Sequence, residues 1–342
     1  MIIILKPNAP ADELRKFTAF LETLGVKVHA CESACRTILS LAGDTSEIPA
    51  DSLSAHRLVE KVIRVQEPYK MANRMFHPGD TIIEIPLAGG GVRHIGAGTF
   101  SVIAGPCSVE SRQQITGIAR EIKKAGAGFL RGGAFKPRSS PYSFQGLGCE
   151  GLDLLREAKK ETGLPLVSEL MAPRQLEFFD DVDIIQVGAR NMQNFDLLRC
   201  LGGCRKPILL KRGPAATLTE LLMAAEHIMA GGNARIILCE RGIRGFGDAA
   251  RSTLDLSAVP LLKKKSHLPV IVDPSHATGA GWMVAPLAKA AVAAGADGVM
   301  VEVHNNPEEA LCDGEQAITP EDFAALMDHL KQYARIEGRS LD

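Results

Sequence analysis

The chain has 342 residues, of which 46% are hydrophobic and 23% charged, and its formal net charge is −1. This length and composition predict a globular protein with one large core and room for a smaller second domain. A net charge close to zero excludes a general attraction to nucleic acid or to an anionic membrane, so any basic cluster acts locally. We therefore expect small anions as binding partners, with no nucleic acid and no membrane.

The sequence contains no targeting or membrane signal that we recognise. No stretch approaches the ~18 apolar residues of a membrane span, and the apolar start is interrupted at once by Lys6 and Pro7. The cytoplasm is the expected compartment. The eight cysteines are scattered along the chain, so buried thiols or metal ligands are favoured over a disulfide framework.

Residues 1–65 predict a small α+β domain. The expected elements are a strand at 2–5, a helix at 10–24, strands at 26–31 and 36–41, a short helix near His56 and a strand at 62–65. This β-α-β-β-α-β order is typical of a ferredoxin-like fold. The order alone leaves two roles open, an appendage for folding or assembly and a ligand-sensing regulatory domain.

Residues 66–80 contain two prolines and no clean period, and we interpret them as a linker. Residues 81–86 and 92–95, separated by a glycine-rich turn, predict a β-hairpin at the start of a second domain that spans 81–342.

From residue 100 onward, short apolar runs alternate with helical segments. The runs SVIAGP, GFLRGG, LPLVSEL, DIIQVGA, PILLKRG, ARIILCERG, LPVIVDPSH and GVMVEVH precede helices expected near 111–125, 149–162, 173–180, 194–202, 217–230, 254–266, 282–294 and 320–335. Eight such units predict an α/β fold of the (β/α)8 barrel type, with buried parallel strands. A doubly wound open sheet is the alternative, but no G-x-G-x-x-G motif opens the first unit.

The barrel prediction places active groups at the C-terminal ends of the strands, where two sets of polar residues fall. The first set contains one thiol, one imidazole and two carboxyl groups, and suits a divalent ion such as Mn, Fe, Co or Zn: Cys107, His276, Glu302 and Asp313. The second set contains six cations and calls for a ligand that carries a phosphate and a carboxylate: Arg131, Lys136, Arg138, Arg190, Lys211 and Arg241. Cys312 precedes Asp313, so we expect it near Cys107.

Seven motifs run in order through this domain. They are AGPCSVES (104–111), LRGGAFKPRSSPYSFQGLG (130–148), QVGARNMQN (186–194), LLKRG (209–213), CERG (239–242), DPSHATG (273–279) and VEVHNNPEEALCDGEQAI (301–318). Together they resemble the motifs of the 3-deoxy-7-phosphoheptulonate (DAHP) synthases. The resemblance implies a metal-dependent transferase of the shikimate pathway that condenses phosphoenolpyruvate with erythrose 4-phosphate and water.

The resemblance also implies roles for individual positions. The divalent metal would be bound by Cys107, His276, Glu302 and Asp313. Phosphoenolpyruvate would be held by Arg131, Lys136, Arg190, Lys211 and Arg241, with Gly188 and Ala189 in the same site, and erythrose 4-phosphate by Lys136, Pro137, Arg138, Ser139 and Ser140. Lys136 is a candidate proton donor, and Glu169 is a candidate for ordering the attacking water.

The N-terminal domain resembles the regulatory extension of the short-chain microbial subgroup in element order and position. This likeness implies feedback inhibition by tyrosine or phenylalanine and a homotetramer.

Three alternatives remain at this point. Octulosonate-phosphate synthases, which use arabinose 5-phosphate, carry K-A-N-R-S-S where this chain has Lys136-Pro137-Arg138-Ser139-Ser140. A metal-dependent aldolase would not need six cations, and a sugar-phosphate sensor would not need a Lewis acid.

Overall fold

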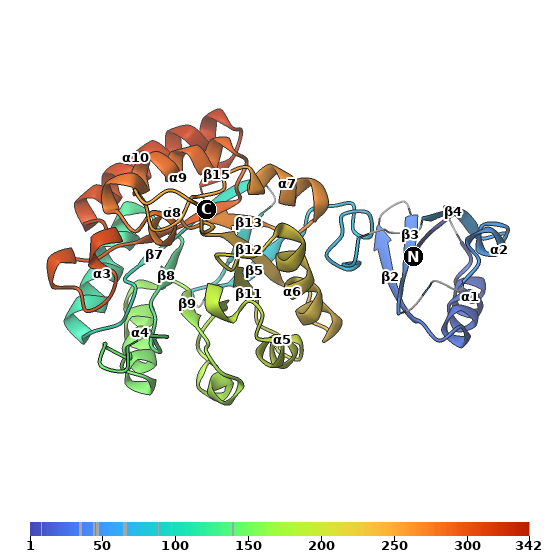
Figure 1. Cartoon of the computed structure of the whole chain (residues 1–342), viewed down its shortest axis with the longest axis horizontal. Helices are drawn as coiled ribbons and strands as arrows, with labels where there is room; N and C mark the ends of the chain where they lie inside the picture. Colours follow the sequence, from blue (N-terminus) through green and yellow to red (C-terminus); the bar gives the residue numbers. More distant parts are fainter. Residues whose placement is uncertain are drawn as a thin grey trace. The chain divides into compact units, whose positions relative to one another are not determined.

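The computed structural model of the chain describes residues 1–7, 9–33, 36–43, 45, 48–63, 67–87, 89–96, 98–138 and 140–341. It divides into two compact units, Met1–Gly79 with Lys265–His267 and Asp80–Lys264 with Leu268–Asp342. Figure 1 shows the elements of both units. Among the described residues, no helix combines the length and the apolar character needed to cross a membrane.

The first unit contains a four-stranded antiparallel sheet with the strand order β2-β3-β1-β4. Its elements are β1 (Ile2–Leu5), α1 (Ala11–Thr23), β2 (Lys27–Ser33), β3 (Arg36–Ala42), α2 (Ala50–Ser54) and β4 (Val59–Ile63). This order and pairing confirm the ferredoxin-like fold predicted from the sequence.

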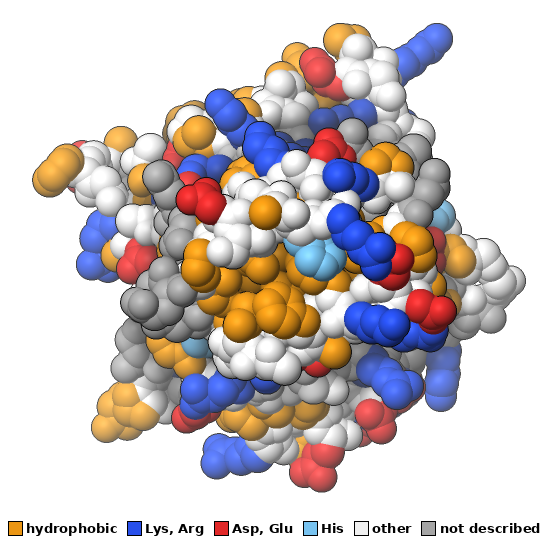
Figure 2. Space-filling model, turned by 90° about the vertical axis from the view of Figure 1, so that its right-hand side faces the viewer, with side chains coloured by type: hydrophobic (Ala, Val, Ile, Leu, Met, Phe, Trp, Pro, Cys, Tyr) orange, Lys and Arg blue, Asp and Glu red, His pale blue; other side chains and the backbone are white. Residues whose placement is uncertain are grey.

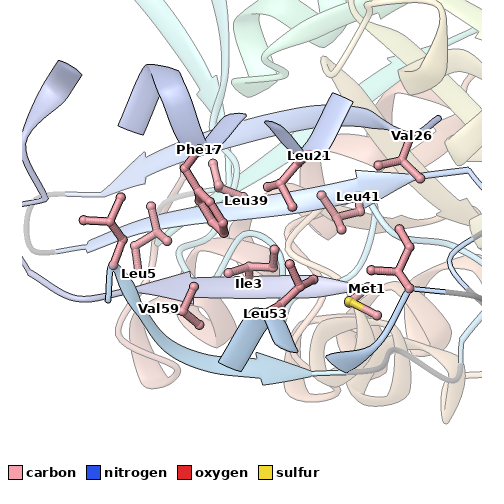
Figure 3. Close-up of a cluster of buried hydrophobic side chains, with 12 residues drawn as sticks. Met1, Ile3, Leu5, Phe17, Leu21, Val26, Leu39, Leu41, Leu53 and Val59 are labelled. Carbon is pink, nitrogen blue, oxygen red and sulfur yellow. The ribbon is translucent and has the colours of Figure 1, made fainter. Parts of the chain in front are cut away.

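Both faces of this sheet are covered by apolar side chains, because successive residues of a strand point to opposite faces. On one face, Ile3 belongs to a buried cluster with Phe17 and Leu21 of α1, as Figure 3 shows. On the other face, Ile2 packs with Phe76. Burial of these side chains stabilises the first unit, and both clusters contain residues of that unit only.

Two elements of this unit differ in extent from the prediction. α2 ends at Ser54, before His56, whose ring stacks on Phe17 with the ring centroids 4.1 Å apart. β4 begins at Val59, earlier than the predicted residue 62, because Val59 is buried and the two polar residues after it are exposed. The predicted strand residues 64 and 65 lie outside the described part of the chain.

The second unit is a closed barrel of parallel strands, in which the last strand, β14, pairs with the first, β7. The strands are β7 (Thr99–Gly105), β8 (Phe129–Arg131), β9 (Leu166–Glu169), β10 (Ile184–Val187), β11 (Ile208–Lys211), β12 (Ile236–Glu240), β13 (Val270–Val272) and β14 (Gly298–Glu302). This closure confirms the (β/α)8 barrel and rules out the open sheet. A short strand, β15 (Ser340–Leu341), also pairs with β7.

Helices surround the barrel strands (Figure 1). The α-helices are α3 (Arg112–Ala125), α4 (Cys149–Thr162), α5 (Phe195–Gly202), α6 (Leu218–Ala230), α7 (Ala258–Lys265), α8 (Pro274–Thr278), α9 (Val284–Ala293) and α10 (Pro320–Ile336). The short 3-10 helices are η1 (Pro173–Phe178), η2 (Ala189–Asn191), η3 (Gly281–Met283), η4 (Pro307–Glu309) and η5 (Gly314–Gln316). The helix predicted after β9 is thus η1, a 3-10 helix. None of its residues is buried, so it lacks the packed apolar face that would stabilise a longer α-helix.

The predicted hairpin consists of β5 (Ile83–Pro86) and β6 (Val92–Ile95). Its buried side chains Ile83, Ile85 and Ile95 share one cluster with a residue from each of the eight barrel strands, among them Ile103 and Phe129. The hairpin therefore packs against the interior of the barrel, and the polar groups of the site lie further along the strands, at their C-terminal ends.

Candidate active site

Polar side chains at the C-terminal ends of the barrel strands surround a cavity of about 390 Å³. Its charged lining residues are Lys136, Arg138, Glu169, Arg190, Lys211, Arg241, Arg244, Arg251, His276 and Asp313. Cations outnumber carboxylates in this lining, so the cavity suits a ligand with several negative charges.

Four potential metal ligands converge beside this cavity. They are Cys107 after β7, His276 in α8, Glu302 at the end of β14 and Asp313 before η5, and one ligand atom of each lies within 4.8 Å of the others. Sulfur, imidazole nitrogen and carboxylate oxygen together fit a borderline divalent ion better than a hard ion such as Mg²⁺. The sequence predicted this group, and the fold brings all four residues together.

Asp273 orients the imidazole of His276. Asp273 Oδ2 lies 2.7 Å from His276 Nδ1, and Asp273 Oδ1 accepts a hydrogen bond of 2.9 Å from the His276 backbone N–H as the N-cap of α8. A proton on Nδ1 leaves Nε2, which is 3.1 Å from Glu302 Oε1, for a cation. Burial lowers the pKa of His276, but the carboxylates of Asp273 and Glu302 outweigh burial and raise it.

The Cys107 thiol lies at the centre of a second set of contacts. Its Sγ donates to Asp313 Oδ2 at 3.1 Å, and Lys136 Nζ lies 3.0 Å from the same sulfur and 3.0 Å from the Cys107 carbonyl oxygen. The side chain of Cys312 lies close to that of Cys107, which confirms the predicted proximity of the two thiols. Cys312 and burial raise the pKa of Cys107, and Cys107 lowers the pKa of Cys312 to about 6.

Asp313 has an unusual backbone conformation for a charged side chain. Its φ of 53° lies in the left-handed region, which aspartate tolerates better than most residues. Burial raises the pKa of Asp313, but the hydrogen bond from Cys107 and nearby cations outweigh burial and lower it to about 2. Asp313 is therefore a carboxylate at neutral pH.

Glu302 is fully buried and has three side-chain partners. Its Oε1 faces Arg131 Nη1 and His276 Nε2, and its Oε2 accepts a hydrogen bond from Gln316. Arg131 also donates to the carbonyl oxygen of Pro106 at 2.9 Å. Arg131 thus lies beside the metal-ligand cluster, behind the lining of the cavity. Burial raises the pKa of Glu302, but His276 and Arg131 outweigh burial and lower it.

Two other cations are held in place by backbone and acid groups. Arg241 Nη2 donates to the carbonyl oxygen of His276 at 2.7 Å, which joins the end of β12 to α8. Arg251 Nη2 lies 3.3 Å from Asp313 Oδ1. Sequence reasoning missed Arg251 and its neighbour Arg244, because both lie in the long segment after β12, beyond the strand-end position that guided the prediction.

Glu169 depends on a glycine for its place in the cavity wall. Its Oε2 accepts a hydrogen bond of 3.0 Å from Gln186 Nε2. A Cβ on Gly188 would lie 2.0 Å from Glu169 Oε1, so only glycine fits opposite this carboxylate. Gly188 and Ala189 both line the cavity.

A buried ion-pair network supports the strand ends that carry Lys211 and Arg241. Arg212 Nη1 lies 2.8 Å from Glu240 Oε2 and 3.0 Å from Asp255 Oδ2. It joins β11, β12 and the segment before α7. Sequence reasoning missed this network, although Arg212 and Glu240 lie within the motifs LLKRG and CERG.

The loop after β8 contributes Lys136, Pro137 and Arg138 to the cavity lining. Ser140 is exposed, and its Oγ accepts a hydrogen bond of 3.3 Å from the Tyr142 backbone N–H. The predicted contact Ser139 lies outside the described residues.

The fold and site define a (β/α)8-barrel enzyme with a metal-ligand cluster beside a cation-lined cavity. The chain belongs to the DAHP synthetase I family, which it matches over residues 82–337, and residues 1–67 match the DAHP synthase ferredoxin-like domain. This membership confirms the family suggested by the sequence motifs.

Named relatives agree with this assignment. The chain is 48% identical, over 99% of both chains, to a phospho-2-dehydro-3-deoxyheptonate aldolase of Thermotoga maritima. A crystal structure of the Thermotoga maritima phospho-2-dehydro-3-deoxyheptonate aldolase (DAHP synthase) superposes with a TM-score of 0.79 at 46% identity and covers 100% of this chain and 99% of that one. A 2-dehydro-3-deoxyphosphooctonate aldolase of Syntrophobacter fumaroxidans is 32% identical over 71% of this chain and 90% of its own length.

Proposed function

We propose that the chain condenses phosphoenolpyruvate with erythrose 4-phosphate and water to give 3-deoxy-D-arabino-heptulosonate 7-phosphate and phosphate, with a divalent metal ion bound by Cys107, His276, Glu302 and Asp313. The observation that carries this proposal is that one cavity is lined both by His276 and Asp313 of the metal-ligand cluster and by a wall of cations. The cations suit the negative charges of two phosphorylated substrates, and a metal ion suits the carbonyl group of the aldehyde.

In this proposal, Arg190, Lys211 and Arg241 bind the carboxylate and phosphate of phosphoenolpyruvate, with Arg131 behind them. Arginine forks and a lysine point charge match these oxygens. Lys211 is buried, Arg241 is half-buried and Arg190 is exposed. Arg138, with Ser139 and Ser140, binds the phosphate of erythrose 4-phosphate. The two substrates are thereby oriented before any bond forms.

The metal, when bound, polarises the aldehyde oxygen as a Lewis acid. A carbon–carbon bond forms between C3 of phosphoenolpyruvate and the aldehyde carbon, and positive character develops at C2. Lys136, buried at 8% exposure, donates a proton to the aldehyde oxygen. Glu169 orders a water molecule that adds to C2, and cleavage of the C2–oxygen bond then releases phosphate.

The choice of Mn, Fe, Co or Zn follows from the donor set. A thiolate disfavours Mg²⁺ and Ca²⁺, whereas imidazole and carboxylates suit several first-row ions. A metal titration that follows phosphate release ranks the four ions.

Two observations favour erythrose 4-phosphate over arabinose 5-phosphate. The loop has the short Lys136-Pro137-Arg138 form without the extra asparagine. The octulosonate relative covers 71% of this chain, whereas the heptonate relative covers 99%.

A phosphate-release assay tests the proposed function. The enzyme, freed of metal and reloaded with Mn²⁺, should release phosphate from phosphoenolpyruvate when erythrose 4-phosphate is present, and should release none when either substrate is omitted. A simple aldolase would form product without releasing phosphate. A sensor would bind the sugar phosphate without turnover, and either result would overturn the proposal.

We further propose that residues 1–65 form a regulatory domain, with 66–80 as its linker, that responds to tyrosine or phenylalanine in a homotetramer. The match of residues 1–67 to the DAHP synthase ferredoxin-like domain supports this proposal. The described residues of this domain include none of the proposed metal or phosphate ligands, which also supports a role other than catalysis.

A further inference from the structure

The carboxylate of Glu110 contacts the neighbours of three proposed metal ligands. Its Oε1 accepts a hydrogen bond of 3.0 Å from Ser108 Oγ and another of 3.0 Å from the backbone N–H of Leu311. Its Oε2 lies 3.4 Å from His304 Nε2. Ser108 follows Cys107 directly, Leu311 is two residues before Asp313, and His304 is two residues after Glu302.

The side chains of Glu110 and His304 are both largely buried, with exposures of 10% and 7%. His304 Nδ1 accepts a hydrogen bond of 3.0 Å from the Asn306 backbone N–H, so a neutral ring carries its proton on Nε2. Nε2 is buried and makes no hydrogen bond with a described residue, and it lies 3.4 Å from Glu110 Oε2. The Glu110 carboxylate is therefore a charged group beside this buried ring nitrogen.

Gln114 fixes the backbone of Glu110 from the first turn of α3. Its Oε1 accepts from the Glu110 backbone N–H at 3.1 Å, and its Nε2 donates to the Ser108 carbonyl oxygen at 3.0 Å. α3 itself begins after Ser111, whose Oγ accepts from the Gln114 backbone N–H. The position of Glu110 is therefore set by a capped helix rather than by a flexible loop.

We propose that Glu110 is a positioning residue that holds the Cys107, Glu302 and Asp313 segments in register for metal binding. These ligands come from separate strand ends, and Asp313 has a left-handed backbone conformation at the N-cap of the short 3-10 helix η5. A carboxylate that accepts hydrogen bonds from the segments of Cys107 and Asp313, and lies 3.4 Å from His304 in the segment of Glu302, restricts the relative movement of the three segments. Glu110 is neither one of the four potential metal ligands nor one of the residues that line the cavity, and this inference rests on the proposed metal-dependent function.

The test measures the affinity of the full-length, metal-freed protein for Mn²⁺ alone by calorimetry, and Co²⁺–thiolate absorption as a second readout. Glu110→Ala should weaken Mn²⁺ binding about 10- to 100-fold and reduce the Co²⁺–thiolate band at equal metal. Glu110→Gln should lose less, because its amide oxygen still accepts from Ser108 and Leu311. Glu161→Gln, which alters an exposed carboxylate paired with Arg120, is the matched control and should leave binding unchanged.

Thermal unfolding of each metal-free variant separates positioning from folding. If Glu110→Ala does not fold, Glu110→Gln and Ser108→Ala decide, and both should weaken Mn²⁺ binding several-fold. Affinities within twofold of wild type for every folded variant would overturn the positioning role. A wild-type protein that binds no divalent ion would instead overturn the proposed function, so the two failures are distinguishable.

Discussion

The buried ammonium group of Lys211 pairs with the carboxylate of Asp273, and the two side chains are 3% and 0% exposed. Asp273 also holds His276, so a single carboxylate serves one proposed phosphoenolpyruvate contact and one proposed metal ligand. Burial alone would raise the pKa of Asp273, but His276 and Lys211 outweigh burial and lower it well below its ordinary value. The cationic wall and the metal-ligand cluster are thus electrostatically coupled.

Asp273→Asn should lower the stability of the fold and weaken metal binding. The amide keeps the size of the side chain but leaves Lys211 without a counter-charge, a loss of about 3–5 kcal/mol for a broken buried pair. The amide has only one oxygen, so it cannot accept from both the His276 backbone N–H and His276 Nδ1–H, which should weaken metal binding about 10- to 100-fold. Denaturant unfolding and metal titration measure the two effects.

Asp297→Asn is the control for this variant. Asp297 pairs with Lys263 and accepts from the Val270 backbone N–H, away from the cluster. It should cost stability without changing metal affinity. Equal metal affinities in both variants would show that Asp273 has no role in orienting His276.

Cys107→Ala should abolish phosphate release and leave the fold intact. The thiolate is the softest of the four ligands, and the barrel closes through its strands and hydrophobic interior rather than through the metal. Phosphate release, metal content and thermal unfolding should be measured together. Cys239→Ala, a buried thiol within the core cluster, is the control and should lose stability while retaining activity. Full activity of a metal-loaded Cys107→Ala sample would remove Cys107 from the site.

The barrel and the metal-ligand cluster were predictable because both follow from local sequence. Continuous apolar runs such as 208–211 indicate strands buried on both faces, and the fold then places the residue after each strand on one rim. The supporting contacts were not predictable in this way. Asp273 lies inside a quoted motif, but its pairing with Lys211 joins residues 62 positions apart. Glu110 and Arg251 likewise act through partners on distant segments, and neither spacing nor period marks such pairs.

Asp255→Asn should reduce the loss of stability in acid. Burial raises the pKa of Asp255, but the Ser257 hydrogen bond and the Arg212 ion pair outweigh burial and lower it. A carboxyl group with a lower pKa in the folded chain stabilises it above the unfolded pKa of ~3.9, and this contribution disappears as the pH falls through the folded pKa. The free energy of unfolding of Asp255→Asn should therefore change less with pH below about pH 4.

Glu240, in the same ion-pair network, should affect the pH dependence of stability in the opposite direction to Asp255. Burial is the largest influence on its pKa and raises it, so the folded chain binds more protons at Glu240 than the unfolded chain does. Removal of its charge in Glu240→Gln should make the acid-side loss of stability steeper. The same pH slope in wild type and both variants would contradict the two assignments.

The enzyme should prefer a four-carbon aldose phosphate. Pro137 restricts the loop between Lys136 and Arg138, and the cavity of about 390 Å³ must hold both substrates. We expect kcat/KM for erythrose 4-phosphate to exceed that for arabinose 5-phosphate by about 10-fold or more. Steady-state phosphate release with both sugars, at saturating phosphoenolpyruvate, measures the ratio. Comparable values would favour the octulosonate alternative.

Deletion of residues 1–79 should leave a barrel that is active but no longer inhibited. The boundary between the two compact units falls after Gly79, and the hairpin that packs into the barrel interior begins later, at Ile83. The deletion also removes contacts to 265–267, such as the hydrogen bond of 2.8 Å between His267 Nε2 and the Met71 carbonyl oxygen. We therefore expect lower thermal stability with retained phosphate release.

Inhibition by an amino acid requires that the ligand bind a less active state more tightly than the active one, since only differential affinity shifts the equilibrium. If that site lies in residues 1–65, full-length enzyme should be inhibited by millimolar tyrosine or phenylalanine, and the truncated enzyme should not respond. Tryptophan, chorismate and prephenate complete the panel. Inhibition that survives truncation would place the site in the barrel. Insensitivity of the full-length enzyme to all five compounds, with a truncation that only changes the oligomer size, would assign the domain to assembly.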